Sequence, residues 1–221
     1  MKHKIASTAV TTALLTFSLA SSAAIFDFQQ WIADNGEQGF TNSSPFTMTE
    51  SGLTLTAMAF DVAGETTLAS NVYMDDTFNG IIGGMGVCTT LTLSMQCDPS
   101  SDDNVSSDGG SAEILTWSFD QNISQIDLEL GDSEHFDFNS TFEYSLNGGI
   151  DWLTAMTAVD GTVSLLLGGS SQIGFRTAGA NTTDYFYIRN ADVAVVPVPA
   201  TAFLFGSGLL GLVSMARRRR T

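Results

Sequence analysis

The sequence predicts an all-β fold, an antiparallel jelly-roll-like β-sandwich. Short runs in which apolar and polar residues alternate dominate residues 25–195, and little helical periodicity interrupts them. Dipeptides typical of hairpin turns separate the runs, which recur about every ten residues. These dipeptides are Asn79-Gly80, Asp108-Gly109, Asn147-Gly148 and Asp160-Gly161.

The alternation also places the individual strands. The runs that predict strands cover residues 51–60, 112–119, 123–130, 141–146, 152–159, 162–167, 172–177 and 184–196. Residues 28–33 predict one short helical turn. Large aromatic residues within the runs are the candidates for the core, namely Trp117, Phe119, Tyr144, Trp152, Phe175 and Phe186.

Charge is unevenly distributed along the chain. All 24 acidic residues lie between Asp27 and Asp192, whereas only two of the eight basic residues, Arg176 and Arg189, lie in that stretch. A surface this acidic repels nucleic acids and anionic membranes, so no nucleic-acid partner is expected. It suits divalent cations or basic partners, or it serves solubility alone.

Residues 1–24 predict a secretory signal peptide. Lys2 and Lys4 precede an uncharged and largely apolar stretch, and Ser22 and Ala24 occupy positions −3 and −1 of a cleavage site. The alternative, a helix of the folded domain, is disfavoured because this stretch carries no charge. Residues 25–195 are therefore expected to form an exported acidic domain.

The two cysteines, Cys88 and Cys97, predict a disulfide, because an exported domain meets an oxidising compartment. On the chain-entropy account, closing so short a loop stabilises a fold by roughly 2.5–3 kcal/mol. Metal ligation by the two thiolates is the weaker alternative.

An acid-rich loop after Cys97 offers oxygen ligands for a calcium ion, which takes about six to eight of them. The loop lacks the spacing of an EF-hand, and its alternative interpretation is a solvated acidic loop. Residues 131–137 form a second acidic cluster with the same ambiguity. The candidate ligands are Asp98, Asp102, Asp103, Asn104, Asp108 and, at the start of the next strand, Glu113.

Residue types that carry catalysis are scarce. His135 is the single histidine of the expected mature domain, and its acidic surroundings favour a loop histidine over a member of a catalytic triad. Too few histidines and cysteines exist for a zinc site, and no pair of carboxylates has a distinctive spacing. We therefore expect no enzyme and no required cofactor, with Ca²⁺ as the one candidate ion.

Sugar binding is a second function typical of sandwich domains. Residues 184–196 place Tyr185, Tyr187 and Arg189 on one strand face, opposite Phe186 and Ile188. Exposed aromatic rings at these positions would stack on sugars. In the alternative interpretation the tyrosines cover the sandwich and only their hydroxyls reach water.

The C-terminal residues predict a membrane anchor. Residues 200–216 carry no charge, and a helix of this length spans about 25 Å, slightly less than a hydrocarbon core. Four cations follow and predict a cytoplasmic end, which places the acidic domain outside. These cations are Arg217, Arg218, Arg219 and Arg220.

The tail, residues 196–221, resembles the PEP-CTERM sorting signal, which combines a short proline motif, one apolar helix and a terminal arginine cluster. The motif here is Val196, Pro197, Val198, Pro199 and Ala200. The usual signal has Glu where this chain has Val198, and the apolar motif is similar to the related V-P-L-P-A tails. The resemblance implies Sec export in a Gram-negative bacterium that makes exopolysaccharide. It also implies recognition of the motif, and cleavage near it, by an exosortase, a membrane-embedded cysteine transpeptidase.

These observations predict a non-enzymatic surface or extracellular-matrix protein. By the resemblance it is an exosortase substrate associated with exopolysaccharide. It would be tethered to the inner membrane with its domain in the periplasm, and then released to the cell surface or matrix. Two alternatives stay open at this point: a secreted carbohydrate-binding or carbohydrate-active protein, and a single-pass membrane protein whose tail is never cut.

Overall fold

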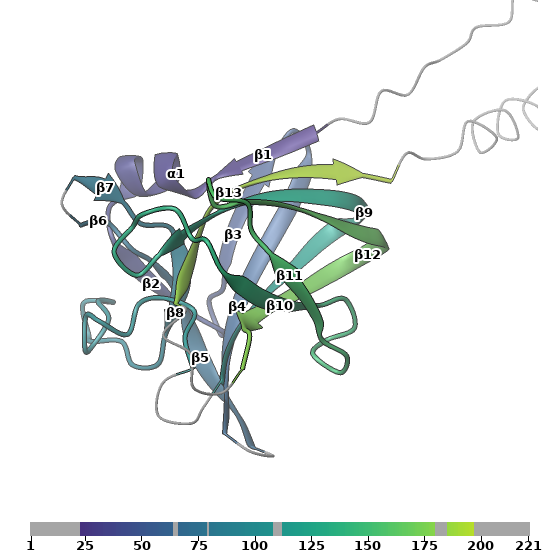
Figure 1. Cartoon of the computed structure of the whole chain (residues 1–221). Helices are drawn as coiled ribbons and strands as arrows, with labels where there is room; N and C mark the ends of the chain where they lie inside the picture. Colours follow the sequence, from purple (N-terminus) through teal and green to yellow (C-terminus); the bar gives the residue numbers. More distant parts are fainter. Residues whose placement is uncertain (1–22, 64–65, 79, 108–111, 180–184, 197–221) are drawn as a thin grey trace, which may run out of the picture. The chain divides into compact units, whose positions relative to one another are not determined.

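The computed structural model describes residues 23–63, 66–78, 80–107, 112–179 and 185–196 of the chain (Figure 1). Strands dominate these residues and their ladders are antiparallel, which confirms the all-β class. In chain order the elements are β1 (Ala23–Asp27), α1 (Phe28–Asn35), β2 (Gln38–Thr41), β3 (Phe46–Glu50), β4 (Leu53–Ala63), β5 (Thr66–Met74), β6 (Thr77–Phe78), β7 (Ile81–Ile82), β8 (Met85–Cys88), β9 (Ala112–Asp132), β10 (Thr141–Ser145), β11 (Leu153–Met156), β12 (Thr162–Thr177) and β13 (Phe186–Val195).

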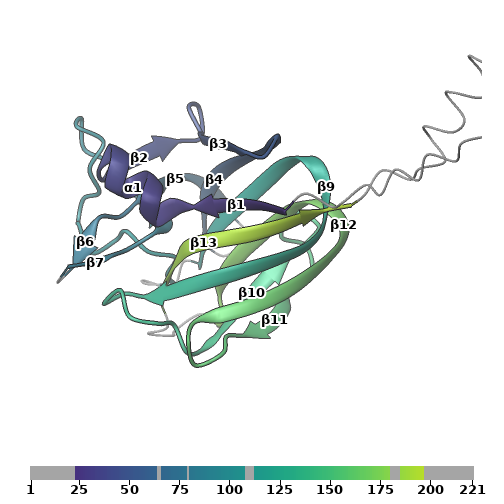
Figure 2. The same ribbon diagram turned by 90° about the horizontal axis from the view of Figure 1, so that it is seen from above.

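Apart from the small β6–β7 hairpin, the described strands belong to one sheet whose pairings close on themselves. β9 pairs with β4, and β5, β8 and β13 follow in turn until β13 pairs with β9 again. β12, β10 and β11 continue outward from the other side of β9, and β1 lies beside β13 (Figure 2). β2 and β3 flank β5 and β4.

This single sheet differs from the predicted jelly-roll of two separate sheets, and β9 is the reason. Two strands were expected at residues 112–119 and 123–130, but one strand runs through both. Its first half pairs with β4 and its second half with β13, while β12 pairs with both halves. The exposed residues 120–122 bend the strand without ending it, so β9 carries the sheet from one layer of the core to the other.

The predicted helical turn is α1, which closes one side of the core. Asp27 caps it by accepting a hydrogen bond from the Gln30 amide at 2.8 Å, as residues at this position commonly do. Gly36, with φ of 81°, ends it. The helix buries Phe28, whose ring lies 5.4 Å from that of Trp117.

Aromatic side chains fill the core, as expected for Trp117, Phe175 and most of the other candidates. Trp117 and Phe175 are fully buried and meet edge to face with ring centres 5.0 Å apart. Phe119 and Phe186 are also buried, and Tyr144 packs half-buried against the core.

Trp152 is an exception, because it is not a core residue. It precedes edge strand β11 and is half-buried, with its indole N–H bonded to the carbonyl oxygen of Gly149 at 2.9 Å. The Arg176 guanidinium lies 4.1 Å from the centre of its ring, in cation–π contact.

The first and last described strands leave the domain side by side, since Ala23 of β1 pairs with Ala194 of β13. Most of the predicted signal peptide and the predicted helix at residues 200–216 lie outside the described residues. No helix within the described ranges is long and apolar enough to cross a membrane.

Candidate functional site

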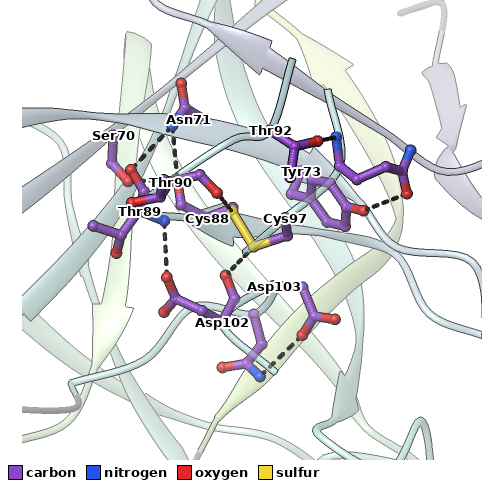
Figure 3. Close-up of a disulfide and its surroundings, with 12 residues drawn as sticks. Ser70, Asn71, Tyr73, Cys88, Thr89, Thr90, Thr92, Cys97, Asp102 and Asp103 are labelled. Atoms are coloured by element: carbon purple, nitrogen blue, oxygen red, sulfur yellow. Dashed lines mark hydrogen bonds between the residues drawn. A yellow bond between two sulfur atoms is a disulfide. The ribbon is translucent and has the colours of Figure 1, made fainter. Parts of the chain in front are cut away.

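The predicted disulfide between Cys88 and Cys97 is present, and it organises one end of the domain (Figure 3). Cys88 ends β8, where it pairs with Asn71 of β5. Its carbonyl oxygen accepts hydrogen bonds from Ser70 Oγ at 2.9 Å and Asn71 Nδ2 at 3.0 Å. The bridge therefore fastens the loop of residues 89–96 to the central strands.

A small apolar cluster of Tyr73, Cys88, Leu91 and Cys97 packs around the bridge, apart from the main core. The Tyr73 hydroxyl donates a hydrogen bond to the Glu37 carboxylate. Burial, and then this carboxylate, raise the pKa of Tyr73 above its ordinary range. The cluster thus ties the loop to the chain that enters β2.

Residues 98–107 leave the bridge and fold across β8 and β13. Val105 N–H donates to the Phe186 carbonyl oxygen at 2.9 Å. The segment lies so close to β8 that a Cβ on Gly86 would sit 2.1 Å from the carbonyl oxygen of Asp103. Only glycine fits there, and the disulfide fixes where the segment starts.

This segment delivers Asp103 to a largely buried position against β13. The Tyr187 hydroxyl donates to Asp103 Oδ1 at 2.5 Å. Burial raises the pKa of Asp103 to about 6, and the nearby Asp75 charge adds to the rise. Burial likewise raises the pKa of Tyr187, so its hydroxyl keeps its proton and remains the donor.

Asp75 and His135 form a second buried pair beside Tyr187. His135 Nε2 lies 2.6 Å from Asp75 Oδ2, and Nδ1 lies 2.9 Å from the Ile81 carbonyl oxygen. Both ring nitrogens face oxygen atoms, an arrangement that favours the doubly protonated ring. Burial alone lowers the pKa of His135, but the hydrogen bonds to Asp75 and Ile81 outweigh it and the net pKa is raised. His135 lies on a loop, as expected, but it is buried there.

Arg189 of β13 holds that loop from the other side. Its Nη1 donates to Asp137 Oδ1 at 2.9 Å and lies 3.5 Å from Glu129 Oε1, while Nη2 donates to the His135 carbonyl oxygen. A Cβ on Gly131 would lie 2.6 Å from the guanidinium Nε, so glycine makes room for it. We call the five side chains Asp75, Asp103, His135, Tyr187 and Arg189 the buried polar network.

Glu113 is a further buried acid at the start of β9. Its Oε2 accepts hydrogen bonds from Ser106 N at 2.8 Å and Ser106 Oγ at 2.7 Å, and its Oε1 accepts one from Thr89 Oγ1 at 3.3 Å. Burial raises its pKa to about 8, although the Ser106 hydrogen bonds act in the opposite direction. Near neutral pH the folded domain therefore keeps a proton here.

The described candidates for calcium ligands lie close together in the sequence. Their side chains do not converge on one point, because each is either exposed or bonded to a partner of its own. Asp98 is exposed, Asp102 Oδ2 accepts from Thr89 N at 3.0 Å, and Asn104 is buried with its amide 3.5 Å from Asp103 Oδ1. Asp103 and Glu113 bind Tyr187 and Ser106, as described above. Asp108 lies outside the described residues.

Among the described residues, one group of three metal-type ligands lies within 4.8 Å of one another: Cys88, Cys97 and Asp102. The disulfide uses both sulfurs, so this group offers a metal only one free ligand. Metal ligation by the cysteines, the weaker alternative from the sequence, does not occur in this oxidised form.

The predicted sugar-binding face on β13 is wrong for two of its three residues. Tyr187 and Arg189 are buried, with 2% and 5% of their surfaces exposed, and Tyr185 is half-buried. Residues 98–107 and the loop that carries His135 cover this part of β13 on its outer side. Tyr187 packs against the domain as in the alternative interpretation, but its hydroxyl does not reach water, because it is buried and bonded to Asp103.

The outer face of β12, β9 and β13 carries a shallow acidic depression of 290 Å³. Asp127 and Asp192 face each other there across β9 and β13, and Glu129 lies one row further along. Asp192 is exposed, whereas Gln125 Nε2 donates to both oxygens of Asp127.

Of the sorting motif, only Val196 is described. Its N–H donates to the Asn122 carbonyl oxygen at 2.8 Å, and 42% of its surface is exposed. The other residues of the tail fall outside the described ranges, namely Pro197, Val198, Pro199, Ala200, Arg217, Arg218, Arg219 and Arg220. A scan against protein-family models finds no match to this chain, and a search of curated proteins finds none either.

Proposed function

We propose that the chain is a non-enzymatic exported protein of the cell surface or extracellular matrix, sorted through its PEP-CTERM-like tail. The observation that carries the proposal is the partition of charge in the sequence. Acids fill the domain, and an uncharged span followed by four arginines ends the chain. The disulfide supports it, since such bridges persist in oxidising compartments.

The geometry around His135 supports a non-catalytic role. A general base must be reachable by a substrate and free to accept a proton. His135 is 3% exposed, and both of its nitrogens already face acceptors. The buried polar network instead holds the segments that carry Asp75, Asp103 and His135 against β13. Its role is therefore structural.

The outer ends of the first and last described strands lie together, which supports a tether. Ala23 and Ala194 are paired, so the segments that precede and follow the domain start from the same edge of the sheet. In the proposed pathway, Sec export and signal peptidase act on the first segment. An exosortase acts on the second, and the released domain joins the exopolysaccharide matrix.

Calcium binding at residues 98–113 is part of the proposal and has a direct test. Millimolar Ca²⁺ should raise the melting temperature, and EDTA should reverse the rise. An unchanged melting temperature would remove calcium from the proposal and leave the acids of this segment as hydrogen-bond acceptors.

Intact-mass analysis of the protein from its own cells tests the sorting proposal. Processing at both ends predicts a mature chain that ends near Pro199. Cleavage after Ala24 predicts an N-terminus at Ile25, and this cut would remove Ala23 and the buried Ala24 from β1. An intact C-terminus in a host that possesses an exosortase would favour the uncleaved membrane anchor instead.

A further inference from the structure

β11 forms an outer edge of the sheet. Within the described ladders it pairs with β10, and no other strand lies on its far side. Alternate backbone N–H and C=O groups of such a strand point outward with no partner in the sheet. An edge of this kind is a template on which another strand can pair.

The side chains at this edge are apolar and exposed. The exposed fractions are 79% for Ile150, 49% for Leu153, 71% for Met156 and 80% for Val159. Residues 152–159 contain no charge, glycine or proline. Uncharged segments with this composition pair readily with other strands when they lie at an edge. We call residues 150–159 the β11 edge.

Two other edges of the sheet, on β2 and on the first half of β12, are protected in ways that this one is not. On β2, Gly39 N–H donates to the Met95 carbonyl oxygen at 2.8 Å, so the disulfide loop covers it. The first half of β12 borders the acidic depression, where Asp127 and Asp192 would repel a second acidic chain. Residues 152–159 carry no carboxylate, so two copies can pair along this part of the β11 edge without placing one acid directly opposite another.

We propose that the β11 edge binds a second copy of this chain, with the two β11 strands antiparallel and the sheet continued from one copy to the other. When a strand pairs with its own copy about a two-fold axis, the free backbone N–H and C=O groups of both edges find partners. No β11 edge is then left for a third copy, so the assembly stops at a dimer. Asp151 and Asp160 flank the uncharged segment, so each comes near an acid of the other copy. Salt screens this repulsion, and association therefore strengthens with ionic strength.

This proposal is independent of the sorting pathway, and cysteine cross-linking of the full chain tests it. Single cysteines replace Leu153, Thr154, Ala155 and Met156 in turn, beside the intact native disulfide. Mild oxidation should give a product of twice the chain mass. Its yield should peak at one position, because only one residue of a two-fold antiparallel pair faces its own copy.

Leu68→Cys is the matched control, since Leu68 is 54% exposed and lies on β5. Cross-linking no greater than this control at all four positions would overturn the proposal. Adducts of another mass would identify a different occupant and would overturn it as well.

Sedimentation of the full chain in a non-ionic detergent gives an independent readout. The dimer fraction should rise from roughly 50 to roughly 500 mM NaCl. Met156→Lys should weaken dimerisation about tenfold, because it removes an apolar contact and adds like charges. Leu68→Lys changes the net charge equally and should not weaken it. Equal effects of the two variants would contradict a role for the β11 edge.

Discussion

Replacing Glu113 with glutamine should stabilise the domain near pH 8 and change its stability little near pH 5. The carboxyl is buried where β9 begins and accepts two hydrogen bonds from Ser106. Burial raises its pKa from an ordinary value of 4.5 to about 8. Because the folded state binds this proton more tightly than the unfolded chain, the stabilisation is fully present below pH 4.5 and is lost as pH rises through 8.

The magnitude follows from the interval between the two pKa values. Within it, each pH unit lowers the free energy of unfolding by about 1.4 kcal/mol. From pH 5 to about pH 8 the wild-type domain should lose on the order of 3–4 kcal/mol through this group. Glutamine mimics the protonated acid: its carbonyl oxygen can accept from Ser106 while its amide faces Thr89. It does not titrate, so the variant should keep that stability.

Urea unfolding followed by tryptophan fluorescence measures the difference at each pH. Asp98→Asn is the control, because it removes an exposed acid from the same part of the chain. Subtracting wild-type from variant stability cancels the titration of groups that both proteins share. If the wild-type and Glu113→Gln curves run parallel between pH 5 and pH 8, the carboxyl is ionised in the folded domain and the reasoning is refuted.

Three further perturbations test other parts of the domain. Replacing both Cys88 and Cys97 with serine should lower the free energy of unfolding by about 3 kcal/mol in urea titrations. Amide hydrogen exchange should become faster in residues 98–107. Unchanged exchange there would show that the disulfide does not hold this segment in place. Asp75→Asn should cost about 3–5 kcal/mol, because it removes the carboxylate from a buried pair with His135; a loss below about 1 kcal/mol would mean that this pair contributes little to stability. Asp192→Asn should raise stability by about 0.2–1 kcal/mol at low ionic strength, since it removes a like charge opposite another carboxylate, and the gain should vanish in high salt.

Much of the strand pattern can be predicted from the sequence, because burial of one face leaves a local alternation. The continuity of β9 cannot. Residues 120–122 are polar and exposed, so they have the composition of a turn. The strand nevertheless stays intact, because β4 pairs with its first half, β13 with its second half and β12 with both. Which neighbours a strand has is a long-range property, and the closed ring follows from it.

The candidate site likewise has features that could be predicted from the sequence and features that could not. The disulfide could be predicted from two cysteines and the predicted signal peptide, because neither cysteine had another cysteine to pair with. The burial of Tyr187 and Arg189 could not, since it depends on residues 98–107 and on the loop that carries His135 folding over β13. One signal was present in the sequence: an arginine within an apolar strand of an acidic domain indicates a buried cation that holds acids together.

The scarcity of cations explains why the interior of this domain should respond to pH. The domain has two arginines. Arg189 forms ion pairs with Asp137 and Glu129, and Arg176 forms one with Glu143. His135 pairs with Asp75, whose carboxylate helps to raise the pKa of the ring. Asp103 is bonded to the Tyr187 hydroxyl and Glu113 to Ser106 and Thr89, and burial raises the pKa of both acids. The packing of the domain is thus tied to proton concentration on both sides of neutrality, near pH 6 through Asp103 and near pH 8 through Glu113.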